Sequence, residues 1–260
     1  MKFKIIYINL YEGCKEKNKF LKVINFIKKE RPDILGLSEL NQWDKNNFSK
    51  LNKFKKQTDL NHSIFCKASS GYNLGLFSKY KLTDRVIISK NFKTGMIKAS
   101  ISIKNKKLSI ILTHLHSMGE DLRLKEIDII KNYVNKKEKV IFMGDLNSLS
   151  SKDNYNEPRL LKAMKKIKSN KFGERILRKE AIDKITKLGF IDSVRKFSKS
   201  FEYSVPTKYN KDQNHFGRLR LDYIFITKNL FKKLSKAKII RTKETNQLSD
   251  HFPVVAEINL

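Results

Sequence analysis

Short apolar runs separated by polar or amphipathic stretches make up the first 150 residues. A strand-like composition marks the runs 2–10, 33–37, 74–77, 86–88, 107–113 and 139–143. Between the first two runs, apolar side chains recur at helical spacing, at Phe20, Val23, Ile24 and Ile27. Pro32 ends that pattern. We therefore predict a helix over residues 19–29 that connects two strands.

A second amphipathic helix is expected over residues 124–134. Its apolar positions are Leu124, Ile127, Ile130, Tyr133 and Val134. This helix lies between the strand-like runs 107–113 and 139–143, so the three segments form a helix-linked strand pair.

The segment from about 148 to 187 interrupts this alternation. It is polar, rich in lysine and partly helical in pattern, and three more strand-like runs follow it, at 221–227, 237–241 and 254–258. No spacer of glycine, serine and proline divides the chain. We interpret 148–187 as an insertion in a single domain over residues 1–260. The predicted fold class is α/β, with two packed sheets flanked by helices.

Composition adds a strong positive charge. The chain of 260 residues has 56 lysines and arginines against 26 acidic residues, a formal net charge of +30. Such a charge attracts polyanions, including nucleic acid. Lysine, isoleucine and asparagine are abundant together, however, as an AT-rich coding sequence would also produce, and both explanations stay open. No apolar stretch approaches the roughly 20 residues that a membrane span needs, which predicts a soluble protein.

The N-terminus and the cysteines indicate a reduced setting. The first apolar run alternates like a strand and has no small-residue cleavage site, so we expect no secretion signal. Cys14 and Cys66 form neither a disulfide framework nor a metal-ligand spacing. We therefore expect a cytoplasmic protein.

Polar side chains follow or precede the strand-like runs, at the ends of strands where α/β sheets place their sites. These side chains are Asn9, Glu39, His114, Asp145, Asn147, Asp222, Asp250 and His251. If the sheets bring the strand ends together, the result is a cluster of carboxylates, amides and imidazoles.

That mixture suits phosphodiester hydrolysis. Glu39 and Asp250 offer the hard oxygen ligands that Mg²⁺ or Mn²⁺ prefers. His251 can take a proton from water near neutral pH, and a carboxylate such as Asp222 would fix its tautomer.

Each of these residues also has an ordinary structural explanation. Asn9 and Asn147 are favoured turn residues. Asp222 could form a surface ion pair with Arg220, and Glu39 could stabilise the start of a helix over 42–54. His116 and His215 fit no such pattern, so no role is assigned to them.

Six short motifs, in this order, resemble those of the endonuclease/exonuclease/phosphatase superfamily. They are Asn9, Ser38-Glu39, Thr113-His114-Leu115, Gly144-Asp145-Leu146-Asn147, Arg220-Leu221-Asp222-Tyr223-Ile224 and Ser249-Asp250-His251-Phe252-Pro253-Val254. The resemblance implies a four-layer sandwich in which two mixed sheets pack face to face with helices outside, as in deoxyribonuclease I.

The resemblance also implies a role for each residue. Glu39 would be the main metal ligand, with Asn9 and Asp250 close to the metal or its waters. Asp145 and Asn147 would orient the attacking water and the phosphate. His251, held by Asp222, would be a base or a phosphate contact, and His114 a general acid for the leaving oxygen.

The substrate is less well determined, because the superfamily hydrolyses many phosphate esters. Asn41 and His114 occupy positions where abasic-site enzymes usually carry lysine and tyrosine, which disfavours that activity. Arg218 and Arg220, in the loop that leads to Asp222, are candidates to bind flanking phosphates, and an ordinary loop with solvated charges is the open alternative. Arg123, on the helix after His114, is a third candidate substrate contact.

We predict a metal-dependent nuclease acting on DNA or RNA as a monomer. The alternatives are a phosphomonoesterase or phospholipid phosphodiesterase, acting on inositol phosphates or sphingomyelin, and a catalytically silent nucleic-acid-binding module.

Overall fold

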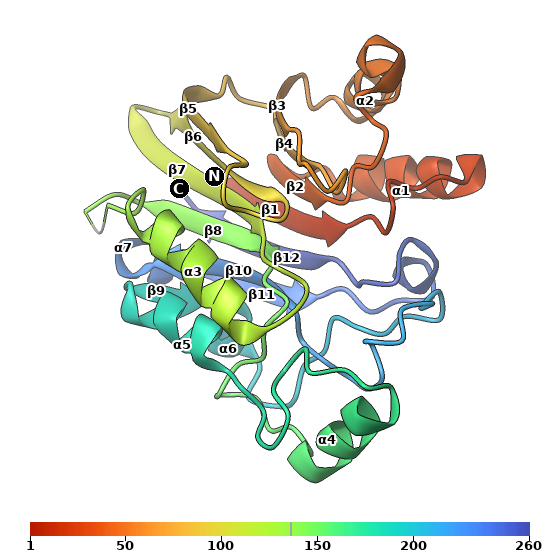
Figure 1. The fold of residues 1–260 in the computed structure, drawn as a ribbon. Helices are drawn as coiled ribbons and strands as arrows, with labels where there is room; N and C mark the ends of the chain where they lie inside the picture. The colour runs from red at the N-terminus through yellow and green to blue at the C-terminus, as the bar shows by residue number, and fades with distance from the viewer. Residues whose placement is uncertain (136) are drawn as a thin grey trace.

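The computed structural model describes residues 1–135 and 137–260, which form two β-sheets with helices outside them (Figure 1). The first sheet has the strand order β11-β12-β1-β2-β4-β3. Its strands are β1 (Lys2–Asn9), β2 (Ile34–Ser38), β3 (His62–Cys66), β4 (Leu74–Ser78), β11 (Leu234–Ile239) and β12 (Val254–Asn259). β1 and β2 are parallel, and the other neighbours are antiparallel, so the sheet is mixed.

The second sheet has the order β5-β6-β7-β8-β10-β9. Its strands are β5 (Thr83–Ile88), β6 (Gly95–Ile103), β7 (Lys106–His114), β8 (Val140–Asp145), β9 (Phe190–Asp192) and β10 (Asp222–Thr227). Here β7 and β8 are the parallel pair. The two parallel pairs, β1/β2 and β7/β8, each lie in the middle of a sheet, where both faces are buried.

The main core lies between the two sheets. Along β1, Ile5 and Tyr7 enter this core, whereas Ile6 and Ile8 point to the helical side of the sheet. The sheets approach closely at Gly36, where an added Cβ would lie 2.8 Å from the methyl carbon of Met143. A side chain at this position would therefore push the sheets apart.

Helices cover both outer faces. α1 (Lys17–Glu30) and α2 (Lys45–Thr58) pack on the first sheet, and α3 (Glu120–Lys131) and α5 (Glu180–Lys187) pack on the second. The other helices are α4 (Glu157–Lys166), α6 (Ser193–Phe197), α7 (Lys228–Phe231) and a 3₁₀ turn at Thr245–Gln247. This arrangement confirms the predicted α/β sandwich of four layers.

The hydrophobic pattern located most elements but not all. Every predicted strand is present within a few residues, and the helices predicted over 19–29 and 124–134 are α1 and α3. β3, β6 and β9 were not predicted. β6 carries lysine and serine among its apolar residues, and β9 has only three residues, so neither produces a strong strand signal.

The segment 148–187 has two parts. α5 packs against the second sheet, whereas the stretch before it forms a small core of its own that is set apart at the bottom of Figure 1, around α4. In this core Leu149, Leu160 and Phe172 contact Val205 and Leu219 from the loop that precedes β10. The inserted segment and that loop therefore support each other beside the sandwich.

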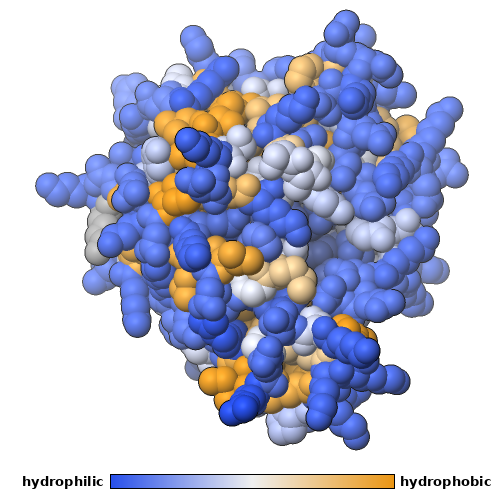
Figure 2. Space-filling view, viewed as in Figure 1, coloured by the Kyte–Doolittle hydropathy of each residue, from blue (hydrophilic) through white to orange (hydrophobic). Residues whose placement is uncertain are grey.

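The surface is mostly hydrophilic on the face shown in Figure 2, where apolar side chains appear only in patches. None of the helices described is both long and apolar enough to span a bilayer.

Candidate active site

The strand directions bring the polar strand ends together at one end of the sandwich. β1, β2, β7 and β8 run toward this end, and β10 and β12 start from it, because they are antiparallel to β8 and β1. Asp222 is thus paired in register with Asp145, and His114 with Asp145 on the other side of β8. Strand pairing thus places the ends of three strands from different parts of the sequence side by side.

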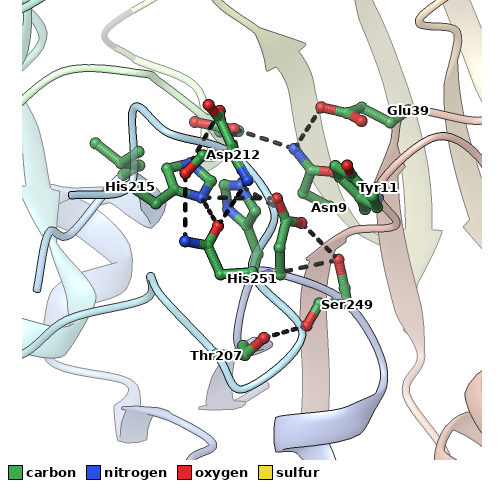
Figure 3. Close-up of polar contacts among 12 residues, drawn as sticks. Asn9, Tyr11, Glu39, Thr207, Asp212, His215, Ser249 and His251 are labelled. Atoms are coloured by element: carbon green, nitrogen blue, oxygen red, sulfur yellow. Dashed lines mark hydrogen bonds and ion pairs between the residues drawn. The ribbon is translucent and has the colours of Figure 1, made fainter. Parts of the chain in front are cut away.

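Asn9 and Glu39 meet at the ends of β1 and β2. The Asn9 amide donates to Glu39 Oε1 at 3.0 Å and to Asp145 Oδ2 at 3.1 Å. Glu39 has φ +59°, and its Oε2 accepts a hydrogen bond from the Glu12 backbone N–H at 2.9 Å. In Figure 3 the Glu39 and Asn9 side chains point toward each other, joined by a dashed line. Glu39 therefore belongs to the site and does not act as a cap for α2.

Asp145 lies close to both histidines of the strand ends and to Asn9. Its Oδ2 lies 3.5 Å from His114 Nε2 and 3.8 Å from His251 Nε2. Burial would raise the pKa of Asp145, but the two imidazoles and the Lys171 ammonium outweigh burial and lower it.

The residues on either side of Asp145 shape the turn that follows β8. Only glycine fits at position 144, because a Cβ there would lie 1.9 Å from the Thr113 carbonyl oxygen. Asn147 adopts φ +48°, donates its backbone N–H to Asp145 Oδ1 at 2.9 Å and donates its amide to the Leu115 carbonyl at 3.0 Å.

His251 and Asp222 form a buried pair. Nδ1 of His251 lies 2.7 Å from Oδ2 of Asp222, and the side chains are 4% and 1% exposed. Burial would lower the pKa of His251, but the carboxylates of Asp222, Asp250 and Asp145 outweigh it and raise the pKa well above its usual value. Asp222 is therefore not in a surface ion pair with Arg220.

Asp250 lies beside His251 and contacts a histidine to which the sequence assigned no role. Its Oδ1 accepts from Ser249 Oγ at 3.1 Å, and its Oδ2 lies 3.6 Å from Nδ1 of His215. The rings of His215 and His251 meet edge to face, 4.9 Å apart (Figure 3). Burial, reinforced by Glu39, raises the pKa of Asp250 to about 6 against the opposing effect of His251.

All eight strand-end residues except Asn9 and Asp222 line one cavity of about 340 Å³. Asn9 and Asp222 lie directly behind it, bonded to residues of its wall. The cavity wall holds five carboxylates but only two lysines, in a chain that is strongly basic elsewhere. The wall consists of Tyr11, Glu12, Glu39, Tyr72, Lys93, Thr94, His114, Leu115, Ser117, Met118, Asp145, Asn147, Lys171, Asp212, Asn214, His215, Asp250 and His251.

A model of the endonuclease/exonuclease/phosphatase family matches residues 6–251, nearly the whole chain and all of this site. The chain belongs to the endonuclease/exonuclease/phosphatase family. The predicted enzyme class, a phosphodiester hydrolase, agrees with this membership.

Solved structures of the same fold have low sequence identity to the chain. An endonuclease/exonuclease/phosphatase family protein from Leptotrichia buccalis C-1013-b and an AP endonuclease from Archaeoglobus fulgidus each align with TM-score 0.71 at 19% identity, covering 99% of this chain and 100% of theirs. D. rerio TDP2, complexed with a single-strand DNA product, aligns with TM-score 0.70 at 19% identity over 100% of this chain and 99% of its own. No curated protein matches the chain by sequence.

The donor set fits the divalent metal on which this family depends. Glu39 and Asp250 are carboxylates at the cavity wall, and the Asn9 amide hydrogen-bonds both to Glu39 and to Asp145. Carboxylate and amide oxygens are the ligands that Mg²⁺ and Mn²⁺ accept, and an excess of carboxylates attracts a cation. His215, Asp250 and His251 also lie close enough together to hold an ion.

Two arginines that were predicted to bind substrate phosphates are buried outside the cavity wall. Arg220 is 1% exposed and pairs with Asp153 at 2.8 Å and Asp192 at 2.5 Å. Arg123 is fully buried and pairs with Glu120 at 2.8 Å. Because their guanidinium groups are bound to protein acceptors, the prediction that they bind substrate phosphates was wrong. Arg218 is exposed and lies over the Tyr203 ring, outside the cavity wall.

Sequence reasoning missed His215, Asp212 and Lys171 in the cavity wall. All three lie in irregular segments with no strand pattern to mark their position. The one feature of the sequence that could have placed any of them in the site was the position of His215, in the loop that leads to Asp222. His116 lies outside the wall, where its Nδ1 accepts from the Met118 N–H at 3.1 Å.

Proposed function

We propose that this protein is a divalent-metal-dependent nuclease that hydrolyses phosphodiester bonds of DNA or RNA. One observation carries the proposal: a buried His251–Asp222 pair presents Nε2 of His251 to Asp145, in a cavity whose wall also holds Glu39 and Asp250. A carboxylate-oriented imidazole next to hard oxygen ligands supplies both the proton transfer and the charge stabilisation that phosphodiester hydrolysis needs.

His251 is the proton-handling group in this proposal. Asp222 accepts a hydrogen bond from Nδ1 and so determines which nitrogen faces the cavity. The Nε2 atom then either takes the proton of the attacking water or, as the imidazolium, donates to a phosphate oxygen. The raised pKa of His251 favours the imidazolium when only protein groups surround it.

Asp145, Asn147 and His114 complete the machinery. Asp145 is within reach of both imidazoles, so it orients a water molecule placed between them. His114, whose Nε2 lies 3.5 Å from the same Asp145 oxygen, gives a proton to the leaving oxygen. Asn147 is anchored by its bond to Leu115 and contacts the phosphate from the cavity wall.

Glu39 and Asp250, with Asn9 adjoining, are the residues that would hold Mg²⁺ or Mn²⁺. When bound, such an ion polarises the phosphoryl group and stabilises the charge that develops on it.

Charge supports a nucleic acid as the substrate. The chain has a net charge of +30, although the cavity wall itself is acidic, so the excess of basic side chains is on the rest of the protein. A polyanion would be attracted to that basic surface around the site. The similarity to D. rerio TDP2, which was solved with a single-strand DNA product, is consistent with this choice. Arg218, exposed next to Tyr203, is the arginine from the original prediction that remains available for a flanking phosphate.

The decisive experiment compares wild type with His251→Ala on labelled single- and double-stranded DNA and RNA, an inositol phosphate and sphingomyelin, with Mg²⁺, Mn²⁺ or EDTA. His62→Ala, at a β3 position outside the cavity wall, is the matched control. We expect metal-dependent cleavage of a nucleic acid by wild type and the control, and loss of cleavage in His251→Ala.

Two other results would reject the proposal. Turnover of only the inositol phosphate or the lipid would favour a phosphomonoesterase or phospholipid phosphodiesterase. Binding of nucleic acid without any turnover would favour a silent binding module. We further propose a monomer in the cytoplasm, where the buried, unpaired cysteines Cys14 and Cys66 stay reduced.

A further inference from the structure

Lys171 brings a buried positive charge into the acidic cavity from the inserted segment. It lies between α4 and α5, is 3% exposed and lines the cavity with His114 and Asp145. No motif includes it. Lysine is among the residues most rarely buried, so its position calls for an explanation.

The Lys171 ammonium makes no hydrogen bond and no ion pair in the part of the chain that the structure describes. The hydrogen bonds of this residue are made by its backbone, with the N–H donating to Ser169 Oγ and the carbonyl accepting from Arg123. Among residues 1–135 and 137–260, its Nζ forms no ion pair, and it contacts the Phe172 ring, whose centre lies 5.3 Å away at cation–π distance. Burial lowers the pKa of Lys171, and Asp145 and Asp212 act in the opposite direction. An unpaired ammonium in this environment is unfavourable for folding.

A buried network holds the Lys171 backbone against the loop after β7. Arg123 donates to the Lys171 carbonyl at 2.5 Å and to the His116 carbonyl at 3.0 Å. The arginine is held in turn by Glu120, which also accepts from Ser148 Oγ at 2.8 Å. The network thus links Lys171 to the segments that carry His114 and Asn147.

We propose that Lys171 binds a non-bridging oxygen of the scissile phosphodiester, as a second cation at the site in addition to the metal. This inference rests on the proposed function, since it names a further group that contacts the same substrate. Lys171 shares the cavity wall with His114 and Asp145, the last residues of β7 and β8, and Asp145 is the carboxylate that acts most strongly on its charge. A phosphate oxygen replaces the missing partner, and its growing charge in the transition state strengthens the contact.

Arg123 is a positioning residue in this scheme. It is not among the residues of the cavity wall, but its hydrogen bond to the Lys171 carbonyl holds the backbone from which the lysine side chain extends.

The test compares Lys171→Met and Lys171→Arg with wild type, and uses Lys165→Met, an exposed position on α4, as the control. The assays are hydrolysis of bis(p-nitrophenyl) phosphate with Mn²⁺ and binding of a hydrolysis-resistant phosphorothioate thymidine hexanucleotide with Mg²⁺. We expect Lys171→Met to lower kcat/KM about 100-fold and to weaken hexanucleotide binding about tenfold. Lys171→Arg should keep part of the kcat/KM and part of the hexanucleotide affinity, and Lys165→Met should match wild type in both assays.

Thermal unfolding separates this role from a structural one. Because the ammonium of this buried residue makes no hydrogen bond or ion pair with the described residues, Lys171→Met should unfold at the same or a higher temperature than wild type while losing activity. A lower unfolding temperature together with unchanged hexanucleotide affinity would assign Lys171 a structural role and overturn the inference.

The remaining outcomes separate this inference from the proposed function. Hydrolysis by wild type with no change in Lys171→Met would reject the role of Lys171 and leave the nuclease proposal intact. If wild type hydrolyses no phosphodiester, the nuclease proposal fails, and hexanucleotide affinity alone decides about Lys171. Weaker hexanucleotide binding by Lys171→Met than by Lys165→Met would support Lys171 as an anion-binding residue. Equal affinities of the two variants would overturn the inference about Lys171.

Discussion

His251 and Asp222 contact each other across the two sheets of the sandwich, with Nδ1 of the imidazole 2.7 Å from Oδ2 of the carboxylate. Asp222 begins β10 of the second sheet, and His251 precedes β12 of the first. Asn9 and Asp145 make a second bridge of the same kind, at 3.1 Å. The candidate active site is therefore assembled by the packing of the sheets, and its geometry depends on that packing.

Replacement of Asp222 by asparagine should remove most of the activity while the fold is kept. The amide matches the carboxylate in size, but it neither stabilises an imidazolium nor selects the same tautomer of His251. We expect kcat/KM to fall by about 10²- to 10⁴-fold, mainly through kcat. Steady-state kinetics of nucleic-acid cleavage measures this, with exposed Asp59→Asn as the control. Activity within threefold of wild type would show that the pair is only structural.

Glu39→Gln should weaken metal binding directly. The glutamine keeps one oxygen that can accept from Asn9, but it loses the negative charge that attracts the cation. We expect the Kd for Mn²⁺, measured by isothermal titration calorimetry, to rise about tenfold or more. Glu174→Gln, at an exposed position outside the cavity wall, serves as the control. Equal Mn²⁺ affinity in both variants would mean that Glu39 is not a metal ligand.

His215 should support catalysis by packing against His251. His215→Ala leaves the edge of the His251 ring without its neighbour, so small displacements of the imidazole become possible. We expect about a tenfold loss in kcat/KM. His215→Phe, which restores an aromatic ring, should recover activity to within about threefold. If phenylalanine is as poor as alanine, the His215 nitrogen beside Asp250 is what matters instead.

Arg220→Met should destabilise the protein. The arginine neutralises Asp153 and Asp192, and removing it leaves two buried carboxylates with less compensation. We expect the free energy of unfolding in urea to fall by about 3–5 kcal/mol. Arg218→Met, at an exposed neighbouring position, should change it by less than about 0.5 kcal/mol. A fall of the same small size for Arg220→Met would refute the structural role assigned to that ion pair.

The strands and the strand-end residues could be predicted from the sequence because both depend on local pattern. Apolar runs of strand length mark β1, β2, β8 and β12, and the polar residues at their ends stand out against those runs. The order of the motifs then indicated the sandwich. β6 escaped prediction because the lysine and serine side chains within it weaken the apolar signal.

The orientation of the basic side chains depended on tertiary structure alone. Arg220 begins one of the six motifs, and Arg123 and Lys171 lie in none of them. Nothing along the chain shows which of the three side chains reaches the cavity. Arg123 and Arg220 meet buried carboxylates that are brought to them by packing, whereas Lys171 meets none and lines the cavity.

The sequence by itself determined which chemical groups stand at the strand ends, and hence the family and the class of reaction. Only the tertiary structure decided which loop residues, His215 and Lys171 among them, join those groups in one cavity. The physical reason is that local apolar pattern marks where each strand ends, and regular hydrogen-bonded pairing then brings those ends side by side. The loops and the inserted segment are positioned by buried contacts between residues far apart in sequence, such as Arg123 with the Lys171 carbonyl.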